Sequence, residues 1–164
     1  MKSVEERLAI VNKILFGGNF ALMTDPIKRG SVHNKMIREK CTGFSMELDN
    51  LSYRGIWIST IEDIKLVLDG QSISKDDMLI RIKGMTIPID ALGEHTEVFW
   101  GPEDKCILEV NMVKGLLKGK HKIELCILKR ADFGHSYGNG IEGYENAHEF
   151  LNPEIIRDAL VVEV

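Results

Sequence analysis

The clearest pattern along this chain is an alternation of apolar and polar residues that recurs five times between residues 44 and 127. Successive side chains of a β-strand point to opposite faces, so an apolar residue at every second position predicts a strand with one buried face. The apolar positions are Phe44, Met46 and Leu48; Ile64, Leu66 and Leu68; Met78, Ile80 and Ile82; Cys106, Leu108, Val110 and Met112; and Ile123, Leu125 and Ile127. We therefore expect five strands that cover a common core.

Residues typical of tight turns separate these segments. Asp69-Gly70 and Lys83-Gly84 accept positive φ, and the segments 101–104 and 115–119 contain glycine or proline at bends. No intervening segment has the helical pattern of a crossover connection, which disfavours a parallel α/β fold. The sequence predicts an all-β protein, an antiparallel β-sandwich of the jelly-roll type.

The two ends of the chain have helical patterns. Residues 4–16 repeat apolar positions every three to four residues, and Ser3 and Glu6 match a capping box. Residues 153–160 begin with proline and predict a short C-terminal helix. We expect one domain over residues 1–164, with an N-terminal helical arm (1–38) that crosses a partner and a C-terminal tail (131–164).

Composition narrows the class of protein. With 44% hydrophobic and 28% charged residues, the 164-residue chain is typical of a globular domain. Its net charge of −4 argues against general nucleic-acid binding, and the lack of an apolar run of about 18–20 residues predicts no membrane span and a cytoplasmic location. Cys41, Cys106 and Cys126 fit no disulfide or metal spacing, so we expect reduced thiols, with Cys106 packed inside.

No self-contained catalytic motif is recognisable. Glu145 and His148 have metal-ligand spacing, but two ligands do not make a site, and ordinary surface residues are expected there. The adjacent acids Glu62-Asp63 and Asp76-Asp77 would point to opposite faces of a strand, so we expect solvated carboxylates rather than an acid–base pair. The hypothesis is that this chain binds no cofactor itself.

The residues best suited to contact a substrate or partner are aromatic, arginine and histidine residues near strand ends and in loops. They are Tyr53, Arg54, Trp100, His135 and Tyr137. An arginine beside the aromatic Trp57 is typical of an interface anchor, while a salt-bridged arginine at a strand end is the open alternative for Arg54. The loop with His135 and Tyr137 is rich in glycine and could close over a neighbour or simply be flexible.

Several short motifs between about Cys41 and Arg130 give the chain a family resemblance. They are Thr42-Gly43-Phe44, Tyr53-Arg54-Gly55, Ile61-Glu62-Asp63, Val67-x-Asp69-Gly70, Phe99-Trp100-Gly101 and Gly115-Leu116-x-x-Gly119-x-His121. Together they resemble the small (β) subunit of the bacterial C-glycoside deglycosidases. The resemblance implies a β-sandwich bound to a TIM-barrel α subunit, which holds a divalent metal, expected to be Mn²⁺, and most of the catalytic groups.

The resemblance also implies a reaction. The complex would be a carbon–carbon lyase that cleaves 3-oxo-C-glycosides, for example from flavonoid C-glucosides, into the aglycone and an anhydro-keto-sugar. A ketone at C3 acidifies the C2 proton, a base removes it, and the metal stabilises the enolate oxygen. The C-glycoside would lie at or near the subunit interface, with Tyr53, Arg54 and Trp100 as contacts.

Two other functions stay open at this point. A stand-alone carbohydrate-binding module would use Trp57, Trp100 and Tyr137 as stacking platforms. A stand-alone sugar isomerase would use His135 and Glu142 with a metal ion. Both differ from the first hypothesis in placing the function on this chain alone.

Overall fold

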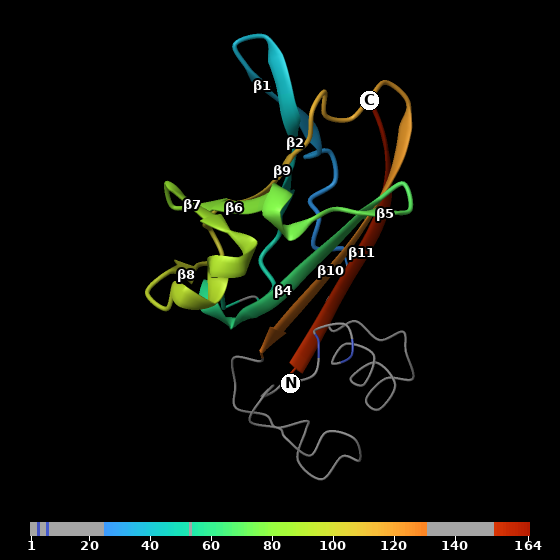
Figure 1. Cartoon of the computed structure of the whole chain (residues 1–164). Coiled ribbons are helices and arrows are strands. Elements are labelled where there is room, and N and C mark those ends of the chain that lie inside the picture. Colours follow the sequence, from blue (N-terminus) through green and yellow to red (C-terminus); the bar gives the residue numbers. More distant parts are fainter. Residues whose placement is uncertain (1–2, 4–5, 7–24, 53, 131–152) are drawn as a thin grey trace.

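The computed structural model describes residues 3, 6, 25–52, 54–130 and 153–164, which fold as two antiparallel sheets and a short ribbon (Figure 1). Every recorded strand pairing is antiparallel. The predicted all-β sandwich is therefore confirmed. None of the helices in the described part of the chain has the length and apolar character needed to cross a membrane.

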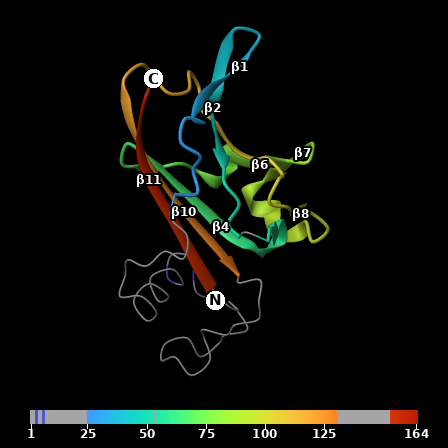
Figure 2. The ribbon, with the colours of Figure 1, turned by 180° about the vertical axis from the view of Figure 1, so that it is seen from behind.

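The first sheet has five strands in the order β1-β2-β9-β6-β7. Their bounds are β1 His33–Ile37, β2 Lys40–Leu48, β9 Cys106–Asn111, β6 Met78–Ile82 and β7 Met85–Pro88. The β1–β2 hairpin projects beyond the rest of the sheet at the upper end of the molecule, and it does so again when the molecule is seen from behind (Figure 2). This sheet therefore reaches further at one end than the core that it covers.

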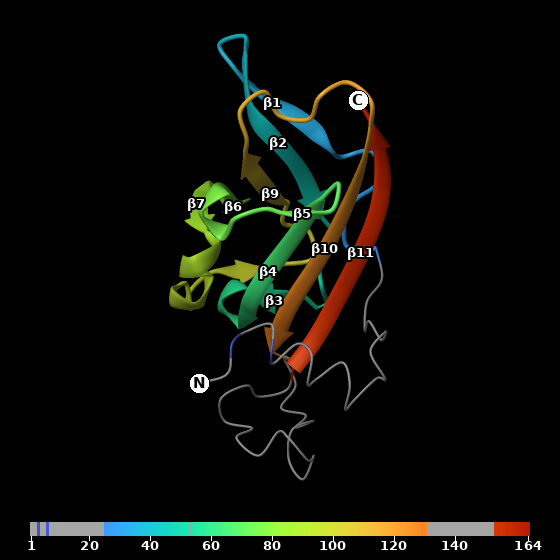
Figure 3. The ribbon, with the colours of Figure 1, turned by 45° about the vertical axis from the view of Figure 1, so that its right-hand side comes forward.

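The second sheet has four strands in the order β11-β10-β4-β5, and a two-stranded ribbon pairs β3 with β8. The bounds are β11 Pro153–Glu163, β10 Lys120–Arg130, β4 Ile61–Leu68, β5 Gln71–Ser72, β3 Ile56–Trp57 and β8 Phe99–Trp100. Three 3₁₀ helices, η1 Ile58–Thr60, η2 Lys75–Asp77 and η3 Ile89–Glu94, complete the described elements. Figure 3 shows β4, β10 and β11 running side by side across the molecule.

The predicted alternation produces the core between the two sheets. Met46, Leu108 and Ile80 lie in one cross-strand row of the first sheet and are fully buried. Leu66 and Leu125 form a matching row in the second sheet. Each such side chain contributes roughly 1.5–3 kcal/mol when it is fully removed from water. Cys106 is also buried, as predicted, and burial raises the pKa of its thiol to about 12.

Two of the four predicted turns are tight hairpin turns, whereas the segments 101–104 and 115–119 connect strands that do not pair with each other. Asp69 and Gly70 both have positive φ, 49° and 82°, and so do Lys83 and Gly84, 50° and 75°. Two positive φ values in a two-residue loop match the right-handed twist of the flanking strands. The β1–β2 turn has the same form at Arg38 and Glu39, with φ of 48° and 68°, although neither residue is glycine.

The predicted C-terminal helix is wrong, because this segment is strand β11. It pairs with β10 along its full length, from Lys120 opposite Glu163 to Arg130 opposite Pro153. The alternation of Ile156, Asp158, Leu160 and Val162 toward the core has period two, which a helix cannot satisfy. Pro153 is tolerated because it begins an edge strand.

The prediction of a separate N-terminal arm is corrected for residues 25–38, the continuous part of the arm that the structure describes. Residues 33–37 form β1, and Ile27 bridges Leu48 at the end of β2, so this segment belongs to the sandwich itself. The capping-box contacts are present, since the Glu6 amide donates to Ser3 Oγ at 3.1 Å and the Ser3 amide to Glu6 Oε2 at 2.7 Å. The rest of the predicted helix over residues 4–16 lies outside the described residues.

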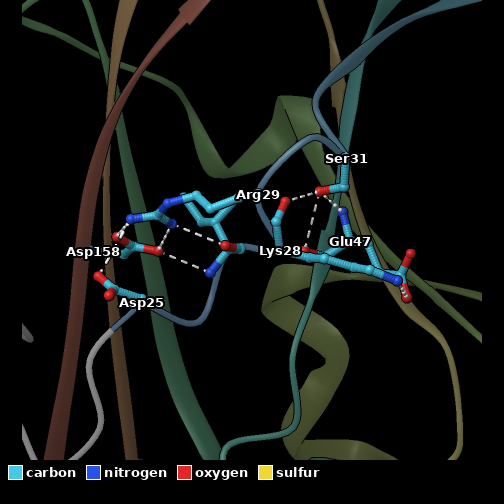
Figure 4. A network of polar contacts seen from close by, with 7 residues as sticks. Asp25, Lys28, Arg29, Ser31, Glu47 and Asp158 are labelled. Atoms are coloured by element: carbon cyan, nitrogen blue, oxygen red, sulfur yellow. Dashed lines mark hydrogen bonds and ion pairs between the residues drawn. The ribbon is translucent and has the colours of Figure 1, made fainter.

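An ion pair ties the segment before β1 to the last strand. Arg29 donates to both carboxylate oxygens of Asp158, at 2.6 and 2.8 Å, and the Ile27 amide donates to the same carboxylate at 2.9 Å (Figure 4). The Asp158 side chain has no exposed area, so these donors replace the water that it loses. Burial alone would raise the pKa of Asp158, but the hydrogen bonds from Arg29 and Ile27 outweigh it and leave the pKa below its ordinary value.

Replacing Asp158 by alanine should therefore destabilise the fold by about 2 kcal/mol, because Arg29 and the Ile27 amide lose a charged acceptor. Asp25→Ala is the matched control, since the Asp25 carboxylate also meets Arg29, at 3.2 Å, but is 71% exposed. We expect a change within about 0.5 kcal/mol there. Urea unfolding measures both, and equal losses would contradict this account.

The same ion pair makes the stability of the fold depend on pH. Because the pKa of Asp158 is lower in the folded chain than in the unfolded chain, the stabilisation by Asp158 is present above its unfolded pKa. This stabilisation is lost as the pH falls through the folded pKa.

Candidate functional site

The family motifs gather in two clusters at different ends of the sandwich. The ribbon cluster contains Gly55, Trp57, Phe99, Trp100 and Gly101, around strands β3 and β8. The hairpin cluster contains Gly43, Asp69, Gly115, Leu116 and His121, near the β1–β2 hairpin and the loop between β9 and β10. Residues far apart in the sequence therefore meet at each end (Figure 1).

A glycine fixes the geometry of the ribbon cluster. Gly55 has φ of +85°, and a Cβ atom there would lie 2.7 Å from both the Phe99 ring and the Trp100 carbonyl oxygen. Any other residue would clash with backbone as well as adopt a disfavoured conformation. The close approach lets β3 pair with β8, with Ile56 opposite Trp100 and Trp57 opposite Phe99.

Trp100 is held inside the protein and has no exposed area. Its indole Nε1 donates to the Asp104 carbonyl at 3.0 Å, and Asn50 donates to the carbonyls of Trp100 and Gly101 at 2.9 and 3.1 Å. A side chain in this position cannot stack on a sugar or a partner, so the predicted contact role of Trp100 is corrected to that of a core anchor. Because it is buried, Trp100 also cannot be one of the stacking platforms that the carbohydrate-binding alternative requires.

The outward-facing part of this cluster, which we call the ribbon surface, is formed by the exposed Trp57 and Arg54 and the half-buried Phe99. Trp57 is 48% exposed, and its ring centroid lies 5.0 Å from that of Phe99 at an interplanar angle of 60°. Arg54, one of the predicted contact residues, is exposed. Phe99 belongs to the sequence motif Phe99-Trp100-Gly101 but was not among the predicted contact residues; it lies between the buried Val98 and Trp100, so alternation places it on the outer face of the ribbon.

Three of the predicted contact residues cannot be placed. Tyr53, His135 and Tyr137 lie outside the described residues, and so do Glu142, Glu145 and His148. Within the described ranges, no group of three or more His, Cys, Asp or Glu side chains comes together as metal ligands.

One of the predicted solvated acids is buried instead. Asp63 is 7% exposed, and its carboxylate lies 2.7 Å from Lys75 Nζ in an ion pair. Asp76 and Asp77 are exposed, as expected. The prediction fails for Asp63 because the chain after β5 brings Lys75, in η2, back to its carboxylate.

Close packing also defines the hairpin cluster. A Cβ atom on Gly43 would lie 1.8 Å from the Val110 carbonyl oxygen, and one on Gly115 would lie 2.5 Å from both Asn34 Oδ1 and Cys41 Sγ. Asn34 holds Leu116 by two hydrogen bonds, donating to its carbonyl at 3.0 Å and accepting from its amide at 2.8 Å. The hairpin and the β9–β10 loop are thus fixed to each other.

His121 fastens the other side of the same loop. Its Nδ1 lies 2.7 Å from Asp69 Oδ2 and its Nε2 lies 2.6 Å from the Leu117 carbonyl oxygen. Both partners are acceptors, so this geometry is satisfied by the protonated imidazole, in which both ring nitrogens donate. The hydrogen bond to Asp69, followed by that to Leu117, raises the pKa of His121, while the hydrogen bonds from His121 and the Lys122 amide lower the pKa of Asp69.

Comparison with known proteins identifies the family of this chain. A family model for the C-glycoside deglycosidase beta subunit matches residues 22–133, which include both clusters. The chain belongs to that family. The motif resemblance found in the sequence is thereby confirmed.

Two relatives have matching names at modest identity. The C-glycoside deglycosidase beta subunit of Eubacterium cellulosolvens is 30% identical over 83 residues, which cover 51% of this chain and 56% of that protein. The corresponding subunit of Arthrobacter globiformis is 25% identical over 80 residues, which cover 46% of this chain and 61% of that protein. The aligned part spans less than two thirds of either relative. Strand β11 lies beyond the matched family range although it is paired throughout with β10.

Replacing Gly55 by alanine should disturb the ribbon surface, because the new methyl group meets both the Phe99 ring and the Trp100 backbone. We expect a loss of at least about 2 kcal/mol in stability and a shifted tryptophan emission. Gly84→Ala is the matched control, since Gly84 has φ of +75° and open space around its Cβ position. It should cost about 1 kcal/mol, from backbone conformation alone. Equal losses in urea unfolding would show that the Phe99 contact has no effect.

The imidazole of His121 should titrate above its ordinary pKa of about 6.5, since both of its nitrogens donate hydrogen bonds. A raised folded pKa means that this stabilisation is fully present below the unfolded pKa and is lost as the pH rises through the folded value. NMR titration of the ring measures it, with the urea-unfolded chain as the reference. Asp69→Asn should bring the value down; an unchanged titration in that variant would contradict the assignment.

Proposed function

We propose that this chain is the β subunit of a hetero-oligomeric C-glycoside deglycosidase and acts together with a TIM-barrel α subunit. The family match over residues 22–133 carries the proposal, because it covers strands β1 to β10 and both motif clusters. In this proposal the complex is a carbon–carbon lyase that acts on 3-oxo-C-glycosides, such as those derived from flavonoid C-glucosides.

The proposed chemistry is an elimination. A ketone at C3 of the sugar makes the C2 proton acidic, a base of the α subunit removes it, and the bond from the anomeric carbon to the aglycone breaks as the aglycone carbon is protonated. The divalent metal that the α subunit is proposed to hold, Mn²⁺, supplies Lewis-acid stabilisation of the enolate oxygen. Our proposal gives this chain an accessory role in which it provides rigid surface and no acid or base.

Within this proposal, the ribbon surface is the part of the chain that approaches the substrate or the substrate pocket. The exposed Trp57 packs against the half-buried Phe99 on a two-stranded ribbon, and the exposed Arg54 precedes the same ribbon. Aromatic rings and an arginine are suited to a flat aglycone and the hydroxyl groups of a sugar. Tyr53, His135 and Tyr137 remain proposed contacts on the strength of the sequence alone.

The test is reconstitution of the complex. The purified chain alone should not cleave a 3-oxo-C-glucoside, whereas co-expression with a TIM-barrel α subunit from the same genome should give cleavage that EDTA abolishes and Mn²⁺ restores. Chromatographic detection of the released aglycone measures the activity. Turnover by the isolated chain, or an α subunit that is fully active without it, would contradict the accessory role.

A further inference from the structure

Exposed apolar side chains gather at the end of the molecule opposite the ribbon surface. Met36 and Ile37 near the tip of the β1–β2 hairpin are 59% and 62% exposed, and Val113 and Leu117 in the β9–β10 loop are 87% and 63% exposed. The two segments touch, since Met36 lies opposite Cys41 and the Cys41 sulfur lies against Gly115. We call these four side chains, with the cations around them, the hairpin surface. The β1–β2 hairpin and the β9–β10 loop that carry them lie at the upper end of the molecule (Figures 1 and 3).

Positive charge surrounds the apolar centre. Exposed residues Arg38, Lys40, Lys114, Lys118 and Lys120 belong to these two segments, against the carboxylates of Glu39 and of Glu163, which lies opposite Lys120 on β11, although the whole chain has a net charge of −4. Within the described part of the chain, none of the five cations forms a recorded ion pair. Their positive charge can therefore attract a binding partner, and it favours a partner surface that carries acidic groups.

The hairpin surface is rigid before anything binds. Asn34 clamps Leu116, Gly119 and Val164 exchange two backbone hydrogen bonds at 3.0 and 2.9 Å, and His121 holds the Leu117 carbonyl. Arg38 and Glu39 keep left-handed backbone conformations at the hairpin tip, where glycine would be less strained. A preorganised surface loses little entropy on binding, which favours a specific protein partner.

We infer that the hairpin surface docks onto the α subunit, at a patch with an apolar centre and a rim of Asp and Glu side chains. The inference rests on the proposed function and adds to it the place and chemistry of the contact. Methionine and arginine are enriched at protein interfaces, whereas membrane-binding surfaces rely on tryptophan and tyrosine, which these segments lack. The apolar centre also distinguishes the surface from a site for nucleic acid.

The experiment measures the Kd of the full chain for the α subunit. The double variant Ile37→Ser with Leu117→Ser should raise the Kd at least tenfold and leave the melting temperature unchanged, because both side chains are exposed. Val161→Ser is the matched control, since Val161 is 65% exposed but lies on the outer face of β11. Its Kd should stay within about twofold of that of the unmodified chain.

The cations are tested separately. Lys114→Glu with Lys118→Glu should slow association at least tenfold and remove most of its dependence on salt concentration, because acidic groups of the partner would be repelled. Lys105→Glu is the control with the same kind of charge reversal and should leave the rate unchanged, since Lys105 is 70% exposed, meets Glu47 only at 3.8 Å, and precedes the end of β9 that is remote from the β9–β10 loop.

Each result supports or overturns the inference. If the unmodified chain binds the α subunit and the double variant binds equally well, the docking surface lies elsewhere while the proposed function stands. If the unmodified chain does not bind the α subunit at all, both proposals fail. Self-association of the chain, or binding to vesicles of anionic phospholipid, that the double variant abolishes would assign the surface to a second copy or to a membrane and overturn the inference.

Discussion

The antiparallel pairing of β10 with β4 on one side and β11 on the other is the interaction on which the rest of the structure depends. It gives the second sheet its inner face of Ile123, Leu125 and Ile127, all at least 98% buried. It also brings Asp158 against the segment before β1, where Arg29 and the Ile27 amide compensate its burial. Because β10 begins at the β9–β10 loop, the same strand places His121 where it holds that loop.

Backbone constraints, rather than polar side chains alone, shape the two motif clusters. Gly55 at the ribbon and Gly43 and Gly115 at the hairpin each lie where a Cβ atom would meet a backbone carbonyl oxygen within 3 Å. Such positions allow strands and loops to approach more closely than ordinary side chains permit. The glycines of the family motifs are therefore explained by packing, and the exposed side chains beside them are the better candidates for contacts with other molecules.

Local patterns in the sequence predicted the core strands and the glycine-containing turns, because period-two alternation and positive φ are properties of short segments. The C-terminal segment was misread because Glu154, Arg157, Ala159 and Leu160 favour a helix, and only pairing with β10 reverses that preference. The choice between Trp57 and Trp100 as the exposed tryptophan also depends on tertiary structure, namely on which face of the ribbon meets the core. Asp69 and His121 are 52 residues apart, so no local pattern could join them.

The two exposed surfaces are mechanically connected, which bears on how an accessory subunit can act. Trp57 passes through η1 directly into β4, and β4 ends at the turn where Asp69 binds His121. This strand of eight residues spans roughly 26 Å at about 3.3 Å per residue and is hydrogen-bonded to β10 along its length. A contact made at the hairpin surface would therefore set the position of the ribbon surface through a stiff sheet. The family role proposed for this chain requires such rigidity, because a subunit that supplies surface must hold that surface in a fixed place.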